Sequence, residues 1–168
     1  MQGSEKSSRR GRRSTTMGGM PLTDMPWWRW RSNVRSALHM LSDPAFQQET
    51  WLAGRPGYGD VTDAVYRLVE DTWLDNWSAD KYLGTIFRDA QEAQLVDAAV
   101  LNVLRIMHQV GADAPVTAYI EHPAWPEAVR VAREAHVRLA TADGEDPDAP
   151  PCSLEVLALM TGAPGAPA

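Results

Sequence analysis

The sequence predicts an all-α protein, a compact bundle of five or six helices over residues 26–141. Apolar residues recur in that region at spacings of three and four, which places them on one face of a helix. An aspartate, a proline or, at residues 43 and 44, both stand where most of these stretches begin, as is typical of helix N-termini. No stretch alternates apolar and polar residues for long enough to predict a β-strand.

The first helix is expected to begin at Pro26, because proline is favoured at the first helical position. Its expected core face comprises Trp27, Trp30, Val34, Leu38 and Leu41. The rest of its surface is expected to carry Trp28, Arg29, Arg31 and Arg35. The dipeptide Asp43-Pro44 repeats the cap signal and predicts a short second helix that stops before Gly54. That helix carries Phe46, Thr50 and Trp51.

Asp60 is expected to cap the third helix, with Asp63 as a further carboxylate in its first turn. The buried stripe of this helix comprises Val61, Ala64, Val65, Leu68, Val69 and Thr72. The polar residues Asn76, Ser78 and Asp80 break the pattern, and a short turn or helix is expected over residues 81–87.

Asp89 and Glu92 form an aspartate version of the capping box and predict a helix over residues 90–110 that ends at Gly111. This helix is about 30 Å long at 1.5 Å per residue, so we expect it at the centre of the bundle. Its inward residues are Val96, Ala99, Val100, Val103, Leu104 and Met107.

A short helix is predicted over residues 116–121, ended by His122-Pro123, and the last helix begins at Pro126. Its inward residues are Ala128, Val131, Ala132, Ala135 and Leu139. Its outward residues are Arg130, Arg133, Glu134 and Arg138.

The formal net charge of −6 over 168 residues is unevenly distributed. Residues 1–40 hold eight basic and two acidic side chains, a sum of +6, and the remainder of the chain sums to −12. The sequence has no run of 18 apolar residues, which excludes a membrane-spanning helix. A single cysteine, Cys152, excludes an internal disulfide and argues against a cysteine-based zinc site.

Both ends of the chain are expected to lie outside the bundle. Residues 1–25 are expected to form a disordered basic arm. An export signal requires an apolar run after its arginines, and this segment has none, so we expect a cytoplasmic protein. Residues 142–168 read as a Pro/Gly-rich linker and tail. Residues 153–160 could form two helical turns, which alone are marginal in water. Such a helix needs a groove on its own body or on another chain, which leaves a homo-oligomer open.

An acidic run is the main candidate site and predicts a basic protein partner, because dense charge of one sign selects the opposite sign. Trp27, Trp30, Trp51 and Trp73 are interpreted as core anchors, whereas Trp28 and Trp77 are harder to bury. The candidate partner-binding residues are Asp60, Asp63, Glu70, Asp71, Asp75, Trp77 and Asp80. The competing interpretation of this run is a solvated helix surface.

No catalytic, cofactor or metal motif is present, and His39, His108, His122 and His136 have no metal-binding spacing. We therefore expect a non-enzymatic interaction module, of the immunity, antitoxin-like or adaptor kind. A small enzyme without a recognisable motif is one alternative. The other is a DNA-associated regulator, because arginines displace counterions from phosphates. Its residues would be Arg9, Arg10, Arg12, Arg13, Arg29, Arg31 and Arg35.

Three short motifs carry a resemblance to a known group of proteins. They are Asp43-Pro44 with Trp51 and Gly54, then Asp89 with Glu92-Ala93, then Pro123-Ala124-Trp125-Pro126. Over residues 26–140 the chain resembles small, acidic, all-helical actinobacterial proteins of uncharacterised function. The resemblance implies a helical fold and transfers no activity to any residue.

Overall fold

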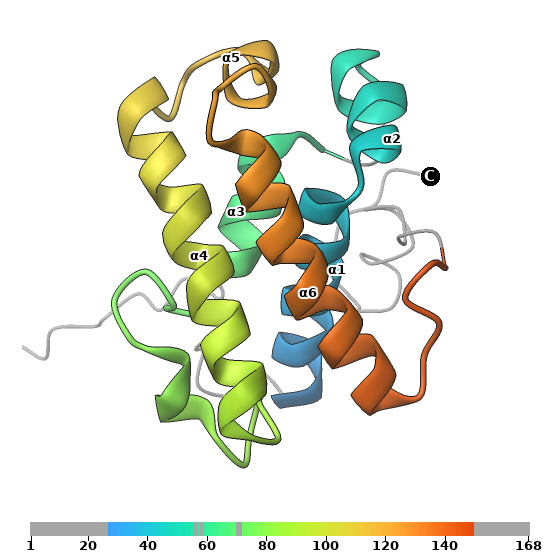
Figure 1. Cartoon of the computed structure of the whole chain (residues 1–168), viewed down its shortest axis with the longest axis vertical. Coiled ribbons are helices and arrows are strands. Elements are labelled where there is room, and N and C mark those ends of the chain that lie inside the picture. Colours follow the sequence, from blue (N-terminus) through green and yellow to red (C-terminus); the bar gives the residue numbers. More distant parts are fainter. Residues whose placement is uncertain (1–26, 56, 58, 70–71, 150–168) are drawn as a thin grey trace, which may run out of the picture.

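The computed structural model describes residues 27–55, 57, 59–69 and 72–149, and most of these residues are helical (Figure 1). The expected basic arm (1–25) and tail helix (153–160) lie outside these residues. The described α-helices are α1 (Trp27–Ser42), α2 (Pro44–Phe46), α3 (Val61–Val69), α4 (Ala90–Val110), α5 (Val116–Ile120) and α6 (Trp125–Asp143). A π-helical turn (Gln47–Leu52) continues α2, and a 3₁₀ helix (Ala79–Tyr82) precedes α4. No strand occurs among the described residues, so the predicted all-α class is confirmed.

The helix α6 is the common neighbour of α1 and α4, and α3 packs against α1 (Figure 1). In the view of Figure 1, α4 and α6 run side by side in front and α5 crosses one end. The predicted inward faces of α3 and α6 are confirmed as buried. On α4 the face is buried from Val96 to Val103, whereas Leu104 and Met107 are only partly buried.

The ends of α4 form where the sequence predicts them. The Asp89 carboxylate accepts the N–H of Glu92 at 2.9 Å, and Gly111 caps the other end with a φ of 96°. The Glu92 side chain departs from the predicted capping box, because it accepts the N–H of Arg88 instead of that of Asp89.

The tryptophans divide differently from the prediction. Trp51 is buried and Trp30 is partly buried, but Trp27 and Trp73 are about half exposed, so their prediction as core anchors was wrong. Trp27 is the first residue of α1, and Trp73 lies in the turn after α3. The second buried tryptophan of the core is Trp125. Its Nε1 donates a hydrogen bond to Gln47 Oε1 at 3.0 Å.

Arg31 contradicts the prediction that it lies on the exposed side of the first helix. It is 4% exposed and donates two hydrogen bonds to the fully buried carboxylate of Glu92, at 2.8 and 3.0 Å. Its remaining donors reach the carbonyl of Ile86 at 2.7 Å and the carboxylate of Asp143 at 2.9 Å. One guanidinium therefore joins α1, α4, the loop before α4 and the end of α6.

Residues beyond the expected boundary at 141 belong to this packed body. The helix α6 ends at Asp143, whose carboxylate also pairs with Arg35 and Arg88, each at 2.9 Å. Gly144 then adopts the left-handed conformation with φ 74°, and the N–H of Glu145 donates to the carbonyl of Ala140. This bond and the left-handed glycine form a Schellman helix end.

Two buried imidazoles pack where α1 meets α6. The rings of His39 and His136 lie 4.7 Å apart between centroids, and the Nδ1 of His136 lies 3.3 Å from the carbonyl oxygen of Arg35. Burial, and then the charge of His136, lowers the pKa of His39 to about 4, although Asp43 opposes this shift. Burial also lowers the pKa of His136. The folded state therefore favours neutral rings.

We predict that Glu92→Gln lowers the free energy of unfolding by about 3 kcal/mol, because it leaves part of the Arg31 charge buried without its partner. The control is Glu145→Gln, which removes the half-exposed partner of Arg35 and should cost less than about 1 kcal/mol. Urea denaturation followed by circular dichroism measures both. Equal losses in the two variants would contradict the assigned importance of the buried pair.

The low pKa of His39 predicts an acid-sensitive fold. The unfolded chain binds more protons than the folded chain between about pH 4 and pH 6.5, so stability falls as the pH drops through that window. Relative to His39→Gln, the wild type should lose about 2 kcal/mol of unfolding free energy between pH 7 and pH 4.5. Urea denaturation at both pH values measures this difference, and a difference that does not change with pH would refute the prediction.

Candidate partner-binding surface

The predicted acidic residues do not form one cluster in the described structure. Asp60 and Asp63 lie at the N-terminal end of α3, and Asp75, Trp77 and Asp80 follow its C-terminal end. Asp63 lies six residues before Val69, the last residue of α3, which corresponds to about 9 Å along the helix axis. Two further members of the predicted set, Glu70 and Asp71, lie outside the described residues.

Asp60 and Asp63 serve the helix end. The Asp60 carboxylate accepts the N–H groups of Thr62 and Asp63 at 2.7 and 3.2 Å, and the Asp63 carboxylate accepts the N–H of Asp60 at 3.0 Å. This reciprocal capping satisfies donors that a helix start would otherwise leave unpaired. It accounts for both side chains without invoking a partner.

The second group borders a groove of about 280 Å³ between the segment after α3 and the outer side of α4. Its apolar lining comes from both segments and its acidic lining from Asp75 and Asp97. The full lining is Leu74, Asp75, Asn76, Trp77, Ser78, Asp97, Val100, Leu101 and Leu104. Trp77 and Asp75 are thus brought together with residues of α4 that the sequence analysis did not select.

Asp97 positions this segment. Its carboxylate accepts the Ser78 hydroxyl at 2.7 Å and the Ala79 N–H at 2.8 Å, which ties the start of the 3₁₀ helix to α4. The sequence shows an ordinary aspartate on a helix, and only the long-range contact reveals its role.

The surface beside the groove exposes large apolar side chains. Leu101 is 62% exposed, and Trp73 and Trp77 are 46% and 47% exposed. In the sequence, Leu101 could have been noticed only as a leucine on the otherwise polar side of the α4 pattern. We define the tryptophan surface as Trp73, Asp75, Trp77, Asp80 and Leu101.

Trp73 has a backbone conformation that normally favours glycine. Its φ is 59°, and among the described residues it is the one position other than glycine with a positive φ. The N–H of Leu74 donates to the carbonyl of Val69 across this residue, the pattern that also surrounds Gly144 after α6. A half-exposed tryptophan thus occupies a place where glycine would be less strained.

Within the described part of the chain, the carboxylates at and beside the tryptophan surface form no ion pair. Among the ion pairs of the described residues, none includes Asp75, Asp80 or Asp97. The single lysine in this region, Lys81, places its ammonium 3.0 Å from the centroid of the Trp77 ring. The Trp77 ring therefore already receives a cation on its face.

Three of the seven arginines of the DNA hypothesis lie in the described structure, and two of these three are paired with carboxylates of the body. Arg31 and Arg35 pair with internal carboxylates, and Arg29 stacks over Trp28 at 5.3 Å from the ring centroid. The other four, Arg9, Arg10, Arg12 and Arg13, lie outside the described residues.

The histidines are scattered across the body. Beyond the pair of His39 and His136, His122 accepts the N–H of Ala124 through Nδ1 and His108 is exposed on α4. Within the described part of the chain, no three His, Cys, Asp or Glu side chains form a group that could hold a metal ion. None of the described helices is long and apolar enough to cross a lipid bilayer.

The strain at Trp73 can be measured with a pair of substitutions. Trp73→Gly should be more stable than Trp73→Ala by about 1 kcal/mol, because both remove the indole but only glycine relieves the left-handed backbone. At the exposed Trp28 on α1, whose φ is negative, glycine should not be the more stable of the two. Thermal or urea unfolding of the four variants provides the comparison, and the same order at both sites would show no strain at Trp73.

Comparison with known proteins gives a family and no activity. No curated protein and no solved structure matches this chain. A family model described as a domain of unknown function, DUF7945, matches residues 25–147. The matched region begins at the start of α1 and includes the residues after α6 that pack on the bundle. The chain therefore belongs to the DUF7945 family.

Proposed function

We propose that this domain is a non-enzymatic protein-interaction module that binds a basic protein partner through the tryptophan surface. The observation that carries the proposal is Trp73, a half-exposed indole kept in a strained conformation, whose carbonyl accepts the N–H of the equally exposed Trp77. Strain of this kind persists where function requires it, and exposed tryptophan is a frequent source of binding energy.

Charge supports a basic partner in particular. Asp75 and Asp80 are exposed and form no ion pair with another described residue, so a cationic side chain of the partner could neutralise them. The contact of Lys81 with Trp77 shows that this ring accepts a cation on its face, although Lys81 occupies that face in this structure. Apolar anchors with an acidic border form a suitable site for a basic amphipathic segment.

An immunity, antitoxin-like or adaptor role in the cytoplasm fits this binding mode. The actinobacterial source inferred from the resemblance stays part of the proposal. A DNA-associated role gains no comparable support, since Arg31 and Arg35 of α1 are already paired with the carboxylate of Asp143.

Charge reversal tests the proposal. The double variant Asp75→Lys, Asp80→Lys should lose the basic protein that the wild-type chain recovers from source cells at low salt. Asp113→Lys with Glu121→Lys, two exposed acidic residues elsewhere, changes the net charge equally and should retain it. Recovery of no basic protein by the wild type, or equal loss in both double variants, would refute the proposal.

The tryptophan anchor is tested on the recovered partner. Trp77→Ala should raise the Kd about 30-fold or more, which corresponds to a binding hot spot of about 2 kcal/mol. The matched control is Trp28→Ala, which removes an equally exposed tryptophan from α1. Isothermal titration calorimetry gives both values, and equal effects would argue against a specific role for Trp77.

A further inference from the structure

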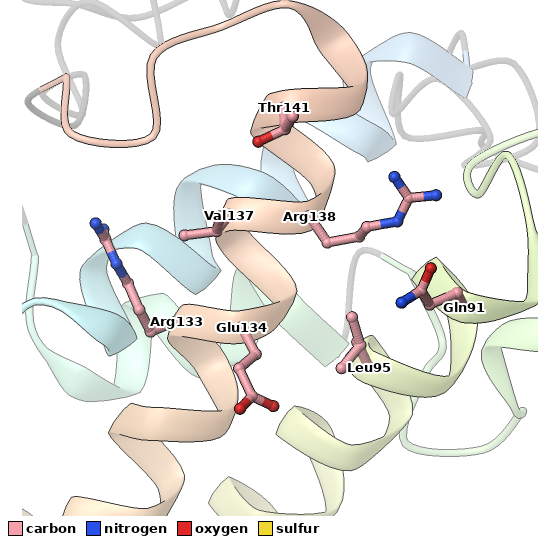
Figure 2. A pocket seen from close by; sticks show the side chains of 7 residues that line it. All are labelled: Gln91, Leu95, Arg133, Glu134, Val137, Arg138 and Thr141. Atoms are coloured by element: carbon pink, nitrogen blue, oxygen red, sulfur yellow. The ribbon is translucent and has the colours of Figure 1, made fainter.

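The residues after α6 fold back along the bundle, and we call residues 144–149 the strap. The reversal occurs at Gly144, whose φ of 74° is left-handed. Figure 2 shows Arg133 and Arg138 on opposite sides of α6. Arg138 extends toward α4 and pairs with Asp89, whereas Arg133 bonds to the strap. The strap therefore begins with a glycine and returns on the Arg133 side of α6.

Two arginines attach the strap to the helices. Arg133 of α6 pairs with Asp148 and donates to the carbonyl of Pro147 at 3.2 Å. Arg35 of α1 pairs with Glu145 at 2.7 Å. The side chains of Glu145 and Asp148 are 54% and 74% exposed, and ion pairs this exposed are weak. These two pairs position the strap, but they hold it only weakly.

A buried imidazole lies beneath the strap. The Nε2 of His136 lies 3.1 Å from the carbonyl oxygen of Pro147, and its Nδ1 lies 3.3 Å from that of Arg35. A neutral imidazole has a single N–H, so it can donate to one of these two oxygens at a time. His39 packs on the same ring, and both histidines are buried. The strap thus forms part of the cover over a pair of imidazoles.

Four charged side chains act on this pair of rings. They come from both helices, from the residue that caps α2 and from the strap, and they are Arg35, Asp43, Arg133 and Asp148. The arginines and a charge on His136 oppose a proton on the pair, whereas the two carboxylates favour one on His39. Burial has the largest effect and lowers the pKa of both rings, that of His39 to about 4.

Opening of the strap would reverse the effect of burial. A swing about Gly144 moves Pro147 away from His136 and admits water, so the rings bind a proton more readily than they do beneath the closed strap. The arrangement that binds more protons gains population as the pH falls. Acid therefore favours the open strap.

We propose that the strap is a pH-sensitive latch over the pair of His39 and His136. At neutral pH both rings are uncharged and the strap is closed. At acidic pH a proton on the pair favours the open strap while the helices stay packed, and Arg133 then loses Asp148. No strap residue belongs to the tryptophan surface, so this proposal does not depend on the proposed function.

Hydrogen exchange of the full chain, followed by NMR at pH 7 and pH 5, tests the latch. The N–H of Glu145 donates to the carbonyl of Ala140 at 2.9 Å and should exchange when the strap opens. If opening restores the ordinary pKa of His39, the open fraction rises about 20-fold between these pH values. The protection of the Glu145 amide, relative to an unstructured peptide, should therefore fall about 20-fold.

A second amide separates opening of the strap from unfolding of the bundle. The amide of Val103, a buried residue of α4, should be better protected than that of Glu145 at both pH values. Equal protection of the two amides would show that the strap opens only when the bundle unfolds, which overturns the proposal. A change at Glu145 of less than about threefold would overturn it as well.

Substitutions of the histidines assign the response to the pair. The double variant His39→Gln, His136→Gln removes both titrating rings and should reduce the change at Glu145 to less than about twofold. The control His108→Gln, at an exposed histidine of α4, should retain the full change. If circular dichroism shows the double variant to be unfolded, His39→Gln alone should give a smaller change than the wild type. An undiminished change in the folded variant would overturn the assignment of the latch to these rings.

Discussion

The buried pair of Arg31 and Glu92 is the contact on which the arrangement of the bundle depends. Both side chains lose their water, and such a loss is tolerated only when nearly every donor and acceptor finds a partner. Glu92 receives Arg31 and the backbone of Arg88, while Arg31 also reaches Ile86 and Asp143. The first, fourth and sixth helices must therefore meet at one point, and α6 must extend to Asp143 to complete the network.

This network changes how the charge of the chain should be interpreted. The arginines of α1 contribute to a basic segment in the sequence, yet Arg31 and Arg35 are neutralised inside the body by carboxylates of α4 and α6. By contrast, Asp75 and Asp80 are exposed and have no ion pair among the described residues. Two acidic side chains of residues 41–168 therefore stay exposed on the tryptophan surface, whereas two of the three arginines of α1 are paired within the fold.

Two helix ends show how the same local geometry can serve different purposes. After α6 the left-handed position is Gly144, which has no Cβ and adopts a positive φ at little cost. After α3 a hydrogen bond of the same span surrounds Trp73, which adopts that conformation against its steric preference. Gly144 ends α6 so that the following residues can pack on the bundle, whereas Trp73 exposes its indole and accepts the N–H of Trp77 at its carbonyl.

The sequence by itself determined the helices, because caps and apolar spacing act over a few residues. Asp89 and Gly111 marked both ends of α4, and Asp43-Pro44 marked the start of α2. The charge imbalance and the acidic residues after α3 could also be recognised from the sequence alone. Part of the candidate site was therefore predictable, namely Asp75, Trp77 and Asp80.

Only the tertiary structure decided which side chains meet. The partners of Arg31 lie 61 and 112 positions away, so a helical pattern could not distinguish this arginine from one in solvent. The same reason explains why Asp97 and Leu101 escaped notice, since their roles arise where α4 passes the segment after α3. Local spacing specifies a face of a helix, but burial and pairing depend on what packs against that face.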